Sequence, residues 1–181
     1  NNRFGKQVIP LSTGNVVITA TDTYGSVYLF NGATGALISE IHGSSSSLGG
    51  NIADVGVVAL TNGNFVIISS SWSDSYQGLK GAVTWASGVT GISGEVSRAN
   101  SLVGAAGGDS IGSGGVRALS NGNYVVISPG WDNGEVTAAG AVTWGNGATG
   151  TVGIVSADNS LVGQSQYDAV GSGGVDRKSV V

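Results

Sequence analysis

A repeat of 59 residues constrains this chain more than any other feature of its sequence. LTNGNFVIIS at residues 60–69 recurs as LSNGNYVVIS at 119–128, and AVTW at 82–85 recurs at 141–144. A third version, LSTGNVVIT, begins at Leu11. Self-similarity over this length indicates a repeat architecture, in which the residues that recur are usually those that the fold needs.

The composition predicts an all-β fold. The chain has 33 glycines against 2 prolines, and 40% of its residues are hydrophobic but only 10% are charged. Many Val, Ile, Thr and Ser residues with so much glycine are typical of short strands joined by tight turns. The formal net charge is −4, with the basic residues scattered, so we expect no nucleic-acid partner. No apolar run is long enough to cross a bilayer, and we expect no membrane insertion.

The matching words divide the chain into units. Repeat one covers residues 1–49, repeat two 50–106 and repeat three 107–166, and a partial fourth repeat covers 167–181. Together they form one repeat domain. Four short strands are expected in each repeat and one in the partial unit, and each of these strands is too short to be stable alone.

Turn residues and alternating side chains place these strands. Asn-Gly and glycine-rich words predict turns at residues 31–35, 87–91 and 146–150, since these residues accept positive φ cheaply. In the strand GSVYLF at 25–30, Val27 and Leu29 should point one way and Tyr28 and Phe30 the other. The strand tryptophans, Trp85 and Trp144, are predicted to lie in the core.

Several words together resemble the FG-GAP repeats of integrin-α-like β-propellers. They are FG at Phe4 and Gly5, an apolar strand, a turn with NG, VVIS followed by Pro129, and GSVYLF or GAVTW. NGNYVV, NGATG and NSLVG are similar to the repeats of large bacterial surface proteins of the filamentous-haemagglutinin type.

The resemblance implies a β-propeller-type repeat array of about three four-stranded blades plus one strand. It also implies a non-enzymatic structural or adhesive module of a secreted or cell-surface bacterial protein. The alternative fold is a β-solenoid of stacked coils, which would tolerate the glycine and serine.

The calcium loop of the FG-GAP family would fall at residues 12–15, 61–64 and 120–123. None of these segments contains Asp, whereas calcium needs several carboxylates among its six to eight oxygen ligands. We therefore expect neither a metal nor another cofactor.

One formal catalytic motif is present. GDSIG at residues 108–112 matches the G-x-S-x-G nucleophile elbow around Ser110. The elbow needs a strand-to-helix turn and a nearby base, but no helix is expected, His42 is the only histidine and the position equivalent to Ser110 one repeat later is Ala169. We expect no catalytic residue, and a hydrolase is the least favoured function.

Two loops, present only in repeats two and three, carry candidate ligand-binding residues. An exposed indole beside Asp or Asn is what sugar binding uses, which makes a lectin-like glycan binder the alternative function. In the other interpretation each loop tryptophan folds back over its own blade. The candidates are Trp72, Asp74, Tyr76, Trp131, Asp132 and Asn133.

The number of units has a consequence for partners. Propellers typically have four to eight blades, and three open blades would expose two sheet faces and their edges. We therefore expect self-association, with residues 171–181 completing a neighbour's sheet, or packing against neighbouring repeats of a longer chain. A glycan is the other partner considered.

Overall fold

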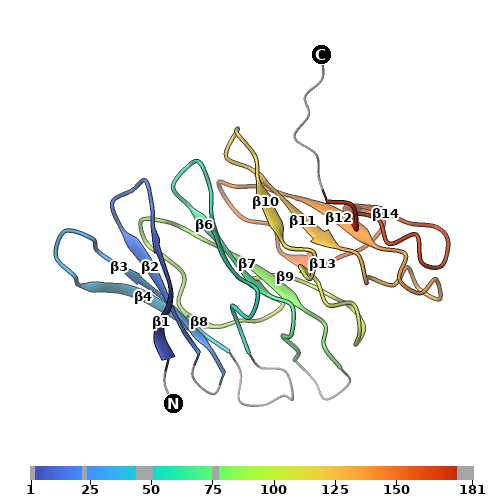
Figure 1. Cartoon of the computed structure of the whole chain (residues 1–181), viewed down its shortest axis with the longest axis horizontal. Helices are drawn as coiled ribbons and strands as arrows, with labels where there is room; N and C mark the ends of the chain where they lie inside the picture. Colours follow the sequence, from blue (N-terminus) through green and yellow to red (C-terminus); the bar gives the residue numbers. More distant parts are fainter. Residues whose placement is uncertain (1–2, 22–23, 44–50, 75–77, 175–181) are drawn as a thin grey trace.

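The computed structural model describes residues 3–21, 24–43, 51–74 and 78–174, and all regular elements in this part are β-strands (Figure 1). They form three sheets that follow one another along the long axis of the molecule. The described residues include no helix that could span a membrane. The sheets do not close into a barrel within this part of the chain.

Each sheet has a core of four antiparallel strands from one repeat. The first sheet contains β1 (Arg3–Pro10), β2 (Val16–Thr21), β3 (Ser26–Phe30) and β4 (Leu37–His42). The middle sheet contains β5 (Gly56–Ala59), β6 (Phe65–Ser69), β7 (Ala82–Ala86) and β9 (Leu102–Val103). The third sheet contains β10 (Val116–Ala118), β11 (Tyr124–Ser128), β12 (Ala141–Gly145) and β14 (Ser160–Val162).

The predicted all-β class and turns are confirmed. Backbone hydrogen bonds close the turns from Gly35 N to the Asn31 carbonyl, from Gly91 N to the Ser87 carbonyl, and likewise at residues 146–150, at 2.8 to 2.9 Å. Side chains in β3 alternate as expected, with Val27 and Leu29 buried. The four core strands of each sheet pair as antiparallel meanders rather than as the stacked parallel coils of a solenoid.

Two short parallel strands, which the sequence did not predict, tie neighbouring sheets together. β8 (Gly94–Glu95) comes from repeat two but pairs with β4 of the first sheet. β13 (Gly153–Ile154) comes from repeat three and pairs with β9 of the middle sheet. Each later repeat therefore reaches back and covers the outer edge of the sheet before it.

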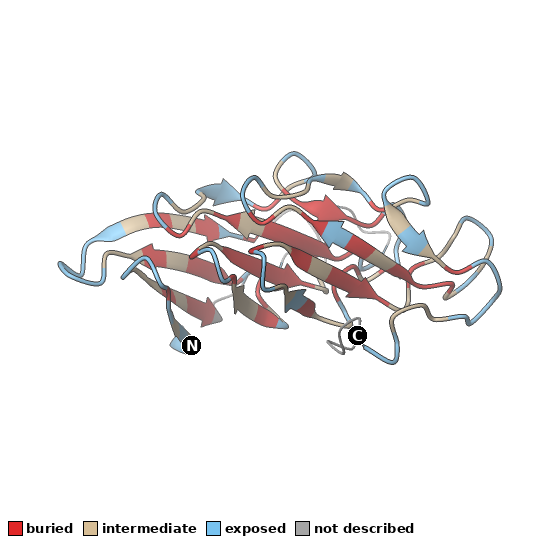
Figure 2. Cartoon of the chain, turned by 90° about the horizontal axis from the view of Figure 1, so that it is seen from above, coloured by how far each residue is buried: buried red, intermediate tan, exposed pale blue. Residues whose placement is uncertain are grey.

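The sheets pack face to face, and the middle sheet is buried on both faces (Figure 2). Successive side chains of a strand point to opposite faces, so Phe65 and Ile67 join the core against the first sheet, while Val66 and Ile68 join the core against the third. This explains why FVIIS in β6 is buried at every position and shows no polar alternation.

The outer face of the first sheet carries an aromatic cluster. Phe4 lies 5.6 Å from Tyr28 and 6.2 Å from Phe30, measured between ring centroids. Phe4 remains exposed. This face is the first apolar end of the stack.

The prediction that both strand tryptophans lie in the core is wrong for Trp144. Trp85 is half-buried and packs with the core between the middle and third sheets. The equivalent Trp144 is 52% exposed, because no described sheet covers the outer face of the third sheet. This face is the second apolar end of the stack.

A glycine on β12 allows a direct test of the packing. Gly145 pairs with the fully buried Tyr124, and a Cβ at Gly145 would lie 2.1 Å from the Tyr124 ring. We expect Gly145→Ala to lower the free energy of unfolding by about 1–3 kcal/mol through overpacking, measured by urea denaturation. Gly173→Ala is the control, because a Cβ there meets nothing within 4 Å. Equal effects of the two substitutions would contradict the assignment.

Candidate functional site

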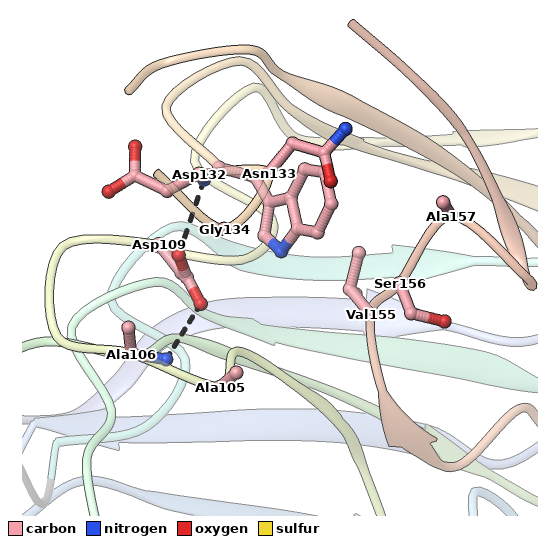
Figure 3. A pocket seen from close by; sticks show the side chains of 10 residues that line it. Ala105, Ala106, Asp109, Asp132, Asn133, Gly134, Val155, Ser156 and Ala157 are labelled. Carbon is pink, nitrogen blue, oxygen red and sulfur yellow. Dashed lines mark hydrogen bonds between the residues drawn. The ribbon is translucent and has the colours of Figure 1, made fainter. Parts of the chain in front are cut away.

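Repeats two and three each have an open hollow beside the loop that follows their second strand. The hollow in repeat two measures about 370 Å³ and is lined by Trp72, Asp74 and residues 95–99. The hollow in repeat three measures about 310 Å³ and includes Trp131, Asp132 and Asn133 in its lining (Figure 3). The two hollows occupy equivalent places in the repeat, and they bring together most of the candidate residues.

The loop tryptophans are buried, which agrees with the interpretation that each loop folds back over its own blade and not with the alternative of exposed indoles. Trp72 is 1% exposed and packs in the core between the first and middle sheets, and Trp131 is 4% exposed in the core between the middle and third sheets. The Trp72 carbonyl accepts hydrogen bonds from Lys80 N and Gly81 N, which fold the loop back over its own sheet. Stacking of a sugar on an open indole face is therefore not the geometry of these loops.

The indole nitrogens stand out for another reason. Trp72 Nε1 and Trp131 Nε1 are both buried, and neither donates a hydrogen bond to a described residue. A buried donor without a partner costs about 1–3 kcal/mol. Each of these tryptophans also lines one of the hollows. Each hollow is therefore lined by a tryptophan whose buried indole N–H has no partner among the described residues.

An ion-pair cluster distinguishes the hollow of repeat two. Lys80 Nζ lies 2.7 Å from Asp74 Oδ1, and Arg98 Nε donates to Asp74 Oδ2. Arg98, and then Lys80, lower the pKa of Asp74 from 3.8 to about 2, against the opposing effect of burial. The same contact raises the pKa of Arg98. The candidate Tyr76 lies outside the described residues.

Acidic side chains in the hollow of repeat three brace the loop. Asp109 accepts hydrogen bonds from Ala106 N at 2.9 Å and from Asp132 N at 3.3 Å (Figure 3). Asp132 Oδ1 accepts from Ala138 N at 2.7 Å. Asn133 Nδ2 donates to the Gly163 carbonyl at 3.1 Å. These side chains hold the wall of the hollow in place, and glycan binding by them stays a prediction.

The residues of the formal nucleophile motif belong to a turn. Ser110 has a φ of 44°, but Ala169, its counterpart one repeat later, has a φ of 45°. The strained conformation is therefore a property of the repeat and does not depend on the hydroxyl. His42, the only histidine, ends β4, and its Nδ1 contacts the Gly43 carbonyl at 2.9 Å. No group of three or more His, Asp or Glu side chains that could hold a metal occurs in the described ranges.

The contact between sheets has a recurring polar centre that the sequence did not reveal. The Gly147 carbonyl accepts hydrogen bonds from Trp85 Nε1 at 3.0 Å, Asn62 Nδ2 at 2.7 Å and Asn64 Nδ2 at 2.8 Å. One repeat earlier the Gly88 carbonyl accepts from Thr13 Oγ1 and Asn15 Nδ2, both at 2.9 Å.

These two glycines have no room for a side chain. A Cβ at Gly88 would lie 1.8 Å from the Gly63 carbonyl oxygen, and one at Gly147 would lie 1.7 Å from that of Gly122. The recurrence of NGN and of the turn glycine at the same offset was the signal available in the sequence.

The ion-pair cluster predicts a pH dependence. Because the pKa of Asp74 is lower in the folded chain, its stabilisation is complete above the ordinary value of 3.8 and is lost as the pH falls through about 2. We expect Asp74→Asn to cost about 1–2 kcal/mol at pH 7, because it leaves the buried Lys80 without its carboxylate. In urea titrations the difference from the unmodified chain should shrink between pH 4 and pH 2.

Asp158→Asn provides the matched control, since the exposed Asp158 carboxylate accepts no hydrogen bond from a described residue. A difference for Asp74→Asn that stays constant over this pH range would contradict the assignment.

Comparison with known proteins places the repeat in a family. A family model described as a repeat of unknown function (DUF5650) matches residues 59–113 and 118–172. No curated protein matches the chain, and no solved structure matches it. The matched model is not one of FG-GAP repeats, so that resemblance stays a prediction. The two matched stretches together span more than half of the chain and lie one 59-residue period apart, and the chain therefore belongs to the DUF5650 family of repeats of unknown function.

Proposed function

We propose that this chain is a non-enzymatic structural and adhesive module of a secreted or cell-surface bacterial protein. The observation that carries the proposal is that two successive sheet-to-sheet contacts are built in the same way. In both, donors from one repeat meet the carbonyl of a turn glycine in the next, at Gly88 and then at Gly147. A contact that repeats is the means by which repeat proteins lengthen.

Burial and edge protection make such a stack stable. No single sheet could bury both of its apolar faces, but the middle sheet does so between its neighbours. β8 and β13 cover the outer edges of β4 and β9, which would otherwise be open to pairing with other chains. The chain therefore suits a spacer that holds its loops at a fixed separation.

The β-propeller arrangement belongs to the same proposal. A meander of four antiparallel strands that packs face to face on the next is the form of a propeller blade. The first strands also meet between units, because Gln7 Oε1 accepts a hydrogen bond from Val57 N at 3.2 Å. The secreted or surface location rests on the resemblance to repeats of bacterial surface proteins.

The proposal predicts that further periods can be inserted. A second copy of residues 60–118, inserted between Ala118 and Leu119, keeps every residue in register. We expect a monomer that is about 10 Å longer by small-angle X-ray scattering, the spacing of packed sheets, with a higher urea midpoint. If the sheets form an open stack, each further copy should lengthen the monomer again. If they form a closed propeller, the lengthening should stop once the ring is complete.

A Gly/Ser linker of equal length at the same point is the control, and it should leave the midpoint unchanged. An inserted copy that unfolds in a separate transition, without raising the midpoint, would overturn the proposal.

A second function is favoured by the unpartnered indole nitrogens. The hollow of repeat three combines the buried donor of Trp131 with Asp132 and Asn133, groups that hydrogen-bond sugar hydroxyls. A lectin-like role would use this lining and not an open indole face.

A glycan array tests this second function. If it is correct, the chain retains a defined set of glycans, and Trp131→Phe, which keeps a buried ring but removes the N–H, weakens their binding at least about tenfold. Trp144→Phe is the control, because it removes an exposed indole N–H that does not line the hollow. No retained glycan, or equal binding by both variants, would contradict the lectin-like role.

A further inference from the structure

We propose that the outer face of the third sheet is a docking face for a further sheet of the same repeat, with Trp144 as its anchor. This inference rests on the proposed structural function and names its partner. The docking face consists of five apolar side chains on β11, β12 and β14. They are Val125, Ile127, Val142, Trp144 and Leu161.

The docking face repeats a surface that is already buried in the same molecule. The middle sheet has the same five residue types 59 positions earlier, and all five pack with the core against the third sheet. Leu102 there is 0% exposed, whereas its counterpart Leu161 is 70% exposed. The equivalent positions are Val66, Ile68, Val83, Trp85 and Leu102. Identical side chains in identical register are therefore covered at one position in the stack, whereas at the next Trp144 and Leu161 are exposed, Val125 and Val142 are half-buried and only Ile127 is already buried.

The polar centre of the contact is also prepared. Trp85, Asn62 and Asn64 donate to the Gly147 carbonyl, and their counterparts are Trp144, Asn121 and Asn123. Those three counterparts donate no side-chain hydrogen bond to any residue in the described part of the chain.

One of these asparagines is already held in place. The Asn123 Oδ1 atom accepts from Gly147 N at 3.0 Å, as Asn64 Oδ1 does from Gly88 N at the same distance. The donors are thus arranged for a glycine carbonyl of one more turn.

The entry path of the partner is present as well. Cβ atoms placed on Gly112 would lie 2.9 Å from the Ile68 side chain and 2.8 Å from that of Val83, and the chain then enters β10 of the next sheet. A Cβ placed on Gly171 would likewise lie 2.8 Å from the Ile127 side chain and 2.9 Å from that of Val142. Residues 171–174 therefore begin the same path over the docking face that residues 112–115 follow over the middle sheet. The continuation expected at 175–181 lies outside the described residues.

This geometry favours a following repeat over a second copy of the chain. The face that the third sheet offers to Trp85 has Thr143 and Gly145 on β12. The outer face of the first sheet has Tyr28 and Phe30 at the corresponding places, so a second copy would present bulky rings where the contact uses small residues. Residues 171–174 also already lie on part of the docking face. The partner is thus a sheet of this repeat that enters through residues 171–174.

A grafted fourth unit tests the proposal. GSGGV is identical at residues 112–116 and 171–175, so residues 117–181 can be appended after Val175 in place of 176–181. In the extended chain, NMR should show hydrogen exchange of the Trp144 indole N–H slowed at least about tenfold relative to the 181-residue chain. The Trp131 indole serves as the internal reference, and its exchange should not change.

A pair of substitutions makes the test specific. Trp144→Ala in the extended chain should speed proteolysis within the fourth unit at least about tenfold. Leu37→Ala, at a similarly exposed residue of the first sheet, should not. If the exchange of the Trp144 indole N–H is unchanged in the extended chain, the proposal is overturned. This holds also when proteolysis shows that the fourth unit is unfolded while the first three units are intact.

A second copy as occupant gives a different result. The 181-residue chain would then sediment as an oligomer that Trp144→Ala dissociates, and this too would overturn a following repeat as the partner. If the grafted fourth unit does not dock but an inserted copy of residues 60–118 folds with the stack, the proposed structural function stands and only the docking proposal fails. If neither does so, the proposed structural function fails as well.

Discussion

The structure depends on the packing of one apolar sheet face against the next. Each sheet is too thin to exclude water alone, and only the middle sheet has both faces covered by the described chain. Burial of apolar surface is non-directional, so it does not by itself fix how the sheets align. The glycine carbonyls of residues 88 and 147, with their convergent donors, supply that direction at each contact.

The local chemistry of the sequence predicted the elements well. Glycine-containing words located the turns, because the last residue of each, at positions 35, 91 and 150, is a glycine with positive φ. The alternation of Val27 and Leu29 with Tyr28 and Phe30 located the faces of β3. The two-residue strands β8 and β13 escaped prediction, because a strand that short shows no periodicity. Their position is set by the neighbouring sheet.

Burial of the tryptophans was harder to predict, and the reason is physical. Trp85 and Trp144 lie in the same word, AVTW, yet one packs against a following sheet and the other is open. Trp72 and Trp131 were candidates for open binding surfaces, but their loops fold back and bury the rings. Exposure is a property of what lies next to a residue in space, which a local pattern does not contain.

The reach-back strands have a mechanical consequence. β8 belongs to repeat two but pairs with the first sheet, and β13 belongs to repeat three but pairs with the middle sheet. Each later unit is therefore hydrogen-bonded into the sheet of the unit before it. Tension between the chain ends would load these parallel pairs in shear, and a unit could leave the stack only after its own strand had slid off the neighbour. Unfolding under force would then start at the last unit and proceed unit by unit toward the first. The stack of small sheets would therefore resist mechanical unfolding more than any one sheet would alone.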